Sequence, residues 1–469
     1  MVVKHLLKLS FLISALLLIG CARSFNPDVE RGSGYDFVPG TPDIRLDAVG
    51  FITNEDETFL NVAIQISKNS LIYRSDFESR FAEIDIDIRI VDEKTSLSQN
   101  YQETITISDP AEDVISELYY FFNEDYEISP GYHRVEVTVT DKTSEKESVR
   151  EARTYIFDPE NPQTDATSVR LYGKNSSAEN NEYTVITTYD IPAANDSILF
   201  ELLISNKYES KALTVEARMI QYESDREPAM ALSDRMPPPG SLKYVGLKHR
   251  NPTVIDQSTR IIEQSGSVQM QYYFETLPIG NYRFEVEIDT SGEENGEKIY
   301  KARDFSVKSK NYPNIMSARE MAEPLVYIMG RKEHRELLKI ENPDSLKKAI
   351  DRFWLSHLQP NQAKAVINMY YERVEMANKF FSTFKEGWKT DMGRVYIMFG
   401  PPLSVERFHN SMVWAYTYNL SDPLYNIRFN RNRVPTEFFP FEHYLVERNS
   451  EYFSLEYQQE QRWLNGIMR

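Results

Sequence analysis

The sequence predicts a multidomain chain in which two tandem all-β antiparallel sandwiches precede an α+β domain of helices and a small antiparallel sheet. Three observations predict this. Apolar and polar residues alternate over many short stretches up to about residue 310. The closing stretch of the first set recurs in the second, and after Asn314 the apolar spacing becomes helical. We therefore expect a first sandwich at 43–160, a second at 165–310 and the α+β domain at 315–469.

The first set of alternating stretches indicates an immunoglobulin-like sandwich. TFLNVAIQIS (58–67), RFAEIDIDIRIV (80–91) and GYHRVEVTVTD (131–141) place apolar residues at every second position, the period of a half-buried strand. In the last of them Val135, Val137 and Val139 form the inward set. Short strands separated by Asp, Asn, Ser and Gly are typical of antiparallel sandwiches.

The second set repeats this pattern and adds an insertion. Segment 130–157 aligns with 279–307, so that Gly131 matches Gly280. Both segments are predicted to be the last hairpin of a sandwich, entered through a glycine turn. Three consecutive prolines follow Arg235-Met236, and such a run is unsuited to a central strand. A long irregular insertion is therefore expected from Arg235 to about Gln257. A stiff surface loop is favoured, with a partner-docking loop as the alternative.

The last third of the chain has helical spacing. Ser317 with Glu320 three residues later is a capping-box pattern, which predicts a helix over 317–338. Apolar residues at helical spacing predict a second helix over 346–358. A third carries one apolar stripe from Ala363 to Phe381 and is expected to end near Gly387 in a left-handed cap.

The N-terminus resembles that of bacterial lipoproteins. A basic start and an apolar run too short for a membrane span predict a signal peptide at 1–20. Leu18-Ile19-Gly20-Cys21 is similar to the lipobox, which implies cleavage before Cys21 and acylation of that cysteine with palmitate-like chains that anchor it in the membrane. A polar tether is expected at 21–42. Ala22 after the cysteine favours the outer membrane, and the absence of an acidic cluster in the sequence after Cys21 favours its periplasmic face.

Composition argues against several classes of function. Cys21 is the one cysteine among 469 residues, so a processed chain has no thiol left for a disulfide, a thiolate nucleophile or a zinc site. The formal net charge of −18, without a basic stripe, argues against nucleic-acid binding. The sequence contains no His-Glu-x-x-His, phosphate-binding glycine loop or nucleophile elbow. No metal and no cofactor is expected.

The stretch GWKTDMGRVYIMFGPP (387–402) carries a specific resemblance. It is similar to the signature of GWxTD-domain proteins, a family of bacterial envelope proteins without an established activity, and the similarity extends over roughly 316–469. Many members have Asp-Glu after the Gly-x-Pro, where this chain has Leu403-Ser404, so any chemistry of that acidic pair is not expected here. The residues of the structural or interaction motif are Gly387, Trp388, Thr390, Asp391, Gly393, Arg394, Gly400 and Pro402.

The motif has a structural and a catalytic interpretation. In the structural one, Trp388 lies on the helical stripe, Thr390 and Asp391 cap a turn, and Gly393 permits a backbone angle closed to other residues. Arg394 then bridges Asp391 or another carboxylate, and RVYIMF forms a buried strand. In the catalytic one, Asp391 is a general base and Arg394 binds an anion, but the sequence offers no evident second titratable partner. The structural interpretation is favoured.

Three functions remain open at this point. The first is a lipid-anchored, non-enzymatic interaction or scaffolding module with an envelope protein partner, for which the aromatic-rich segment 438–457 is a candidate docking face. The second is a glycan or small-ligand binding lipoprotein, which exposed coplanar aromatic side chains on one sheet face would favour. The third is a hydrolase with Asp391 in the site. The anchor, the modular build and the missing chemistry favour the first.

Overall fold

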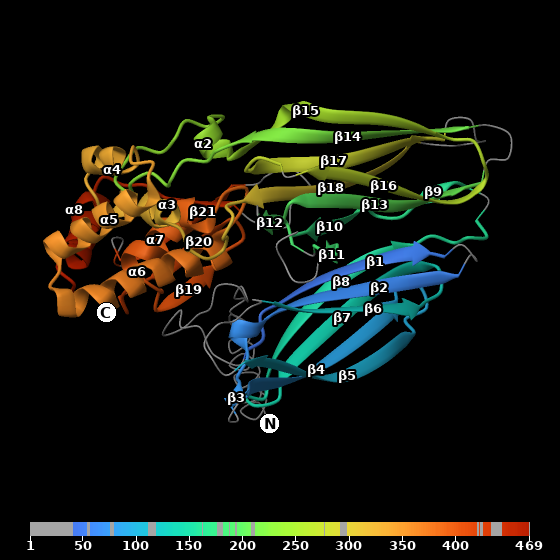
Figure 1. Cartoon of the computed structure of the whole chain (residues 1–469), viewed down its shortest axis with the longest axis horizontal. Helices are drawn as coiled ribbons and strands as arrows, with labels where there is room; N and C mark the ends of the chain where they lie inside the picture. The colour runs from blue at the N-terminus through green and yellow to red at the C-terminus, as the bar shows by residue number, and fades with distance from the viewer. Residues whose placement is uncertain are drawn as a thin grey trace, which may run out of the picture.

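A computed structural model describes residues 41–468, except 54–56, 76–78, 111–118, 162, 176–181, 187, 193–194, 208–211, 276, 291–297, 420–421, 423–424 and 433–442. The expected signal peptide, Cys21 and nearly all of the tether lie outside these residues, as does part of the aromatic segment 438–457. Figure 1 shows two β-sandwiches lying one above the other, with a mainly helical domain beside the second. The predicted fold class is confirmed.

The first sandwich packs two antiparallel sheets over one core. One sheet has the order β1-β2-β6, built from β1 (Ile44–Ile52), β2 (Thr58–Ser67) and β6 (Tyr119–Glu127). The other has the order β3-β4-β7-β8, built from β3 (Arg74–Ser75), β4 (Ser79–Asp92), β7 (Gly131–Asp141) and β8 (Lys146–Ile156), with β5 (Ser98–Pro110) also paired to β4. Val135, Val137 and Val139 are all fully buried between the sheets, as the alternation predicts.

The second sandwich has the same build with one parallel pair. Its first sheet contains β9 (Asp165–Ala166), β10 (Arg170–Lys174), β11 (Thr184–Val185), β13 (Ser197–Asn206) and β16 (Gly266–Glu275). Its second has the order β12-β18-β17-β14-β15, from β12 (Asp190–Pro192), β18 (Ile299–Lys308), β17 (Gly280–Asp289), β14 (Leu213–Ser224) and β15 (Leu247–Ile262). Only β12 and β18 pair in parallel among the described strands of the sandwich. The core between the sheets is rich in aromatic rings, including stacked Phe200 and Phe284.

The recurring segments form equivalent hairpins, β7–β8 and β17–β18. Each begins at its glycine, because β7 starts at Gly131 and β17 at Gly280. The registers differ by one residue relative to the sequence alignment: Gly131 pairs with Ile156, whereas Gly280 pairs with Val307. The partner lies 25 residues after the glycine in the first hairpin and 27 residues after it in the second. The connecting loop, longer by one residue in the second hairpin, accounts for one of these two residues, and the pairing of the strands shifts by the other.

The insertion begins and ends about ten residues earlier than expected. Residues 225–246 leave the sheet after β14 and contain a single helical turn, α2 (Leu242–Val245). From Leu247 the chain is a strand, β15, which pairs along β14 with two register shifts. The expectation of irregular structure to Gln257 is therefore wrong, because the chain after the three prolines is free to pair with β14. We call residues 225–246 the strap.

The helices differ from prediction in the first segment. Ser317 does form a capping box with Glu320, but α3 (Ala318–Ala322) is short and continues into the 3-10 turn η2 (Glu323–Tyr327), with Pro324 at its start. Helix α4 (Arg331–Leu337) begins after Gly330. The single helix over 317–338 is wrong, because proline and glycine interrupt it. The second and third helices are confirmed as α5 (Pro343–His357) and α6 (Pro360–Phe381).

The expected strand RVYIMF is a helix. Residues Asp391–Phe399 form α7, capped by Thr390 and followed by Gly400. The antiparallel sheet lies beyond it, in the order β19-β20-β21-β22, from β19 (Ser404–Arg407), β20 (Ser411–Ala415), β21 (Asn426–Asn432) and β22 (His443–Val446). Helix α8 (Tyr452–Leu464) ends the domain. Among the described residues, no helix is long and apolar enough to cross a membrane.

The strap joins the second sandwich to the helical domain. In Figure 1 the green chain after β14 passes toward α2 beside the orange helices. Leu232 of the strap is fully buried and belongs to the core formed by α5, α6, α7 and the C-terminal sheet. A residue from the second sandwich thus completes the core of a domain that starts some 80 residues later.

Candidate functional site: the GWKTDMG corner

The corner begins where α6 ends. Helix α6 stops at Phe381, and Gly387 lies in the short 3-10 turn η3 (Gly387–Lys389). Gly387 is not among the glycines with positive φ, so the expected left-handed cap is wrong. Glycine is needed at this position because two stretches of backbone approach closely: a Cβ at 387 would lie 1.8 Å from the Ala377 carbonyl oxygen. Glycine lets the corner lie directly against the backbone of α6.

Trp388 is inserted into the helical core. Its side chain is 3% exposed, and its indole N–H donates to Glu386 Oε2 at 3.0 Å. The backbone is held at both polar groups: Trp388 N–H donates to Asn378 Oδ1 on α6, and Tyr327 O–H donates to the Trp388 carbonyl at 2.7 Å. These bonds leave the ring one orientation between α6 and η2.

Thr390 and Gly393 start helix α7. The Thr390 hydroxyl accepts from Gly393 N–H at 3.0 Å, which makes Thr390 the N-cap, and it also donates to the Gly387 carbonyl at 2.7 Å. Gly393 has no positive φ, contrary to the expected special backbone angle. A Cβ at 393 would lie 1.9 Å from the Gly387 carbonyl oxygen, so glycine is needed for contact between the two turns.

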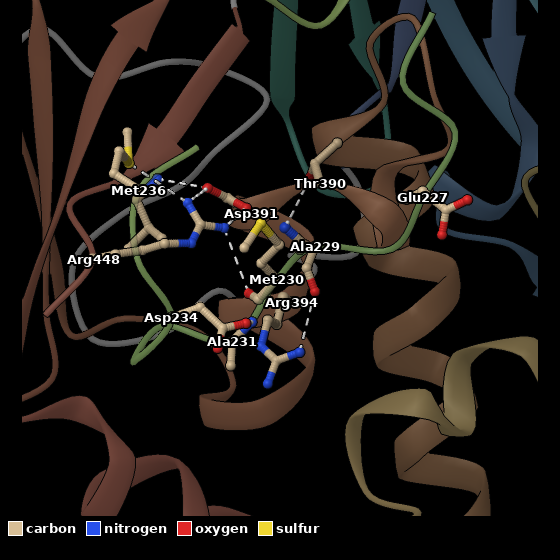
Figure 2. A network of polar contacts seen from close by, with 12 residues as sticks. Glu227, Ala229, Met230, Ala231, Asp234, Met236, Thr390, Asp391, Arg394 and Arg448 are labelled. Carbon is tan, nitrogen blue, oxygen red and sulfur yellow. Dashed lines mark hydrogen bonds and ion pairs between the residues drawn. The ribbon is translucent and has the colours of Figure 1, made fainter. Parts of the chain in front are cut away.

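Asp391 makes a buried ion pair with Arg448. The two carboxylate oxygens accept from the two terminal guanidinium nitrogens, Oδ1 from Nη2 at 2.7 Å and Oδ2 from Nη1 at 2.8 Å. Oδ2 also accepts from Val446 N–H at 2.8 Å. The side chains of Asp391 and Arg448 are 5% and 2% exposed. Figure 2 shows the two groups facing each other, so that Asp391 ties α7 to β22 and the segment after it.

Arg394 pairs with a carboxylate other than Asp391. Its Nε and Nη2 donate to Glu456 Oε1 on α8 at 3.0 and 2.8 Å, and the guanidinium lies over the Tyr327 ring. Nη1 donates to the Ala229 carbonyl of the strap, a contact visible in Figure 2. Arg394 therefore joins α7 to α8 and to the second sandwich.

The strap is bound by the same set of side chains. Arg448 Nη2 donates to the Met230 carbonyl at 3.5 Å, and Glu456 Oε2 accepts from Ser233 N–H and O–H at 3.3 Å each. Asn449 N–H donates to the Leu232 carbonyl at 3.0 Å. Lys385, two residues before the motif, pairs with Asp225 of the strap at 2.5 Å and donates to the Glu227 carbonyl.

The last motif residues close the C-terminus of α7. Gly400 has a φ of 82°, the left-handed region that favours glycine, and Tyr416 O–H donates to its carbonyl. The Arg373 guanidinium lies against Gly400, and its Nη1 donates to the Ile397 carbonyl at 3.3 Å. Pro402 is buried where the chain turns toward β19.

Comparison with known proteins identifies the region that contains this corner. Residues 293–465 match the family model described as the GWxTD domain. This part of the chain is a GWxTD domain. No curated protein matches the chain in sequence. The match to the family begins within the second sandwich, ahead of the expected domain start at 315.

Solved structures resemble the chain only distantly. Red sea bream transglutaminase is 12% identical, with a TM-score of 0.19, covering 58% of this chain and 31% of that one. Native Escherichia coli alpha-2-macroglobulin is 11% identical, with a TM-score of 0.19, covering 58% and 16%. Salmonella alpha-2-macroglobulin reacted with methylamine is 11% identical, with a TM-score of 0.19, covering 60% and 17%. The chain therefore spans less than a third of the length of each of these proteins.

Burial sets the charge states around the GWxTD corner. Burial, then the positive charge of Lys385, lowers the pKa of His443 to about 3, so this histidine is neutral near pH 7. Burial also lowers the pKa of Lys385, against the opposing effect of Asp225. Burial favours a raised pKa for Glu386, but Lys389 at 2.9 Å, a hydrogen bond from Ser309 and the charge of Lys308 together outweigh it, and the net pKa shift is downward.

The arrangement offers positioning rather than acid–base chemistry. The Asp391 carboxylate accepts from a guanidinium and a backbone N–H, neither of which is a nucleophile or a second acid. Within the described ranges, no group of three His, Cys, Asp or Glu side chains could hold a metal ion. The candidate residues Thr390, Asp391 and Arg394 are brought together on the first turn of α7, but each contacts a different element.

Sequence reasoning missed Arg448, Glu456 and the strap. Arg448 and Glu456 lie 57 and 62 residues beyond their partners, and nothing local marks them. One signal was present: a threonine before an aspartate is a strong helix start, which argued for a helix after 390 rather than a strand.

Proposed function

We propose that the protein is a lipid-anchored cell-envelope protein that acts as a non-enzymatic interaction or scaffolding module. Acylated Cys21 would attach it to the outer membrane, with the periplasmic face favoured, and an envelope protein would be its partner. The observation that carries the proposal is that the polar side chains of the GWxTD corner are taken up by contacts within the chain. Thr390, Asp391 and Arg394 all bind other parts of the same chain.

Those contacts join separate elements of the protein. Asp391 and Arg448 connect α7 to the segment after β22, while Arg394 and Glu456 connect α7 to α8 and the strap. Lys308 of β18 adds a bond to the Thr383 carbonyl, and Asn281 of β17 adds one to the Phe384 carbonyl. A domain fastened this way to a sandwich suits a protein that holds a partner at a set distance from the membrane.

The hydrolase alternative has little support around Asp391. A general base needs access to substrate, and Asp391 is 5% exposed with both oxygens accepting hydrogen bonds. Substrate would have to displace a buried guanidinium, which costs several kcal/mol.

The proposal is tested by recovering the tagged full chain from gently solubilised membranes. We expect a near-stoichiometric envelope protein to co-purify with it, and metabolic labelling with a clickable palmitate analogue to mark the wild type but not Cys21→Ser. Cys21→Ser should also leave the membrane fraction. Recovery of the chain alone at native expression level, after mild cross-linking in cells, would contradict the scaffolding role. Labelling that persists in Cys21→Ser would contradict the anchor.

A further inference from the structure

A cleft lies between the two sandwiches, away from the GWxTD corner. It has a volume of about 470 Å³, within the range of small-molecule sites, which often form between domains. One wall comes from β1, β2 and β6 of the first sandwich, and the other from β10, β13 and β16 of the second. Figure 1 shows these two sheets facing each other across the boundary between the sandwiches.

A buried polar side chain forms the floor of this cleft. Asn61 of β2 is 3% exposed, and its amide donates to Asp125 Oδ1 on β6 at 2.5 Å. Its own carbonyl oxygen accepts from Arg170 of the second sandwich. Arg170 Nε is buried and has no hydrogen-bond partner within the described parts of the chain. Burying such a donor is costly unless something satisfies it.

The opposite wall carries the carboxylate of Glu201, which is held in place by hydrogen bonds from side-chain amides. Glu201 Oε2 accepts from the side-chain amides of Gln269 and Gln271 at 2.7 Å each, and Oε1 accepts from Tyr172 O–H at 3.3 Å. Glu201 and Gln269 line the cleft. The two walls together offer carboxylate acceptors, amide groups that donate and accept, and one guanidinium.

An aromatic surface lies beside these polar groups. Phe51 of β1 lines the cleft, and its ring stacks on Phe59 with 5.6 Å between centroids and 19° between planes. Phe59 does not line the cleft, so Phe51 is its aromatic residue. An aromatic ring beside planar polar side chains suits a sugar ring, which has apolar C–H faces and hydroxyls on its rim. By contrast, the rings of exposed Tyr132 and half-buried Tyr155 are tilted by 41°.

We propose that this cleft binds a neutral saccharide. Each hydroxyl both donates and accepts, and so matches a site in which Asp125 and Glu201 accept while Arg170 and the amides donate. Two carboxylates against one guanidinium disfavour an anionic ligand. The site is separate from the protein partner of the proposed function, so either can fail without the other.

The first test is binding of the full chain to a microarray of neutral di- to tetrasaccharides that includes cellobiose, maltose and chitobiose, with sialylated glycans as the anionic comparison. The strongest neutral hit is then titrated by calorimetry. We expect saturable binding to a neutral glycan in preference to its sialylated counterpart. Absence of binding to any neutral glycan at millimolar concentration overturns the proposal, as does preference for the sialylated glycans.

Matched variants place the binding in the cleft. Asp125→Asn and Phe51→Leu should each weaken binding by roughly tenfold, the equivalent of one charged hydrogen bond or one stacking contact. Glu127→Gln and Phe121→Leu, on the same strand β6 but not lining the cleft, should leave it unchanged. Far-UV circular dichroism checks that each variant folds. Binding that survives both cleft variants places the glycan elsewhere and overturns the assignment.

Discussion

Removing the Asp391 carboxylate tests how the GWxTD corner holds its domain. Asp391→Ala leaves Arg448, whose side chain is 2% exposed, as a buried cation without its carboxylate and frees Val446 N–H. Breaking a buried ion pair from one side costs about 3–5 kcal/mol. The free energy of unfolding of the GWxTD domain should fall by that amount.

The assay can isolate this domain within the full chain. All four tryptophans, Trp354, Trp388, Trp414 and Trp463, lie in the GWxTD region and are almost fully buried. Tryptophan fluorescence during urea unfolding therefore reports this domain and not the two sandwiches. The midpoint and slope together give the change in free energy.

Two further variants separate the ion pair from general damage. Asp391→Leu combined with Arg448→Met replaces the pair with apolar side chains and should recover most of the loss, because such replacements are often neutral or stabilising. Asp351→Ala breaks an exposed pair with Lys347 on α5, about half exposed on both sides, and should cost at most about 0.5 kcal/mol. A loss below about 1 kcal/mol for Asp391→Ala would refute the reasoning. So would a double variant whose loss equals the sum of the losses of the single variants Asp391→Leu and Arg448→Met, measured beside it.

The remaining predictions use the same fluorescence signal. Gly393→Ala should cost at least about 3 kcal/mol or prevent folding, because its Cβ would meet the Gly387 carbonyl, whereas Gly330→Ala has open space and should cost under about 1 kcal/mol; equal effects would contradict the close-approach argument. Leu232→Ala in the strap should lower the stability of the GWxTD domain by about 2–5 kcal/mol, and an unchanged midpoint would show that the strap is not part of that core. The pKa of His443 is about 3 in the folded protein, against an ordinary histidine pKa of 6.5, so between these pH values the unfolded chain binds one more proton than the folded chain. The free energy of unfolding should therefore fall by about 1.4 kcal/mol per pH unit as the pH drops through this window. This slope should flatten in His443→Asn, and an identical slope in the variant would count against the buried neutral histidine.

The sandwiches were predictable because their signal is local. A strand with one buried face alternates in sequence, so the alternation alone assigns Val135, Val137 and Val139 to the core. The amphipathic α5 and α6 were predictable for the same reason. Helix α3 ends early because Pro324 follows it, and this proline is a local sequence feature that the prediction of one long helix did not take into account.

Helix α7 could not be assigned from periodicity. It is buried on most sides, including Val395, Tyr396 and Ile397, and a fully buried helix has no polar face to show its period. Its β-branched and aromatic residues then resemble a strand. The Thr390 cap and the close contact of Gly393 with Gly387 decide the outcome, and only the cap is visible in sequence.

The sequence by itself determined the order of the modules, the spacing of the apolar residues and the composition of the motif, because each depends on neighbours along the chain. The tertiary structure decided which groups meet. Arg448 pairs with Asp391, and Glu456 pairs with Arg394. Leu232 packs in a core whose other buried residues all come much later in the sequence. Such pairings depend on how whole elements pack, and an ion pair between distant segments leaves no periodic trace. For this reason GWKTDMG was recognisable as a motif in the sequence, whereas the contacts by which it joins distant parts of the chain are visible only in the tertiary structure.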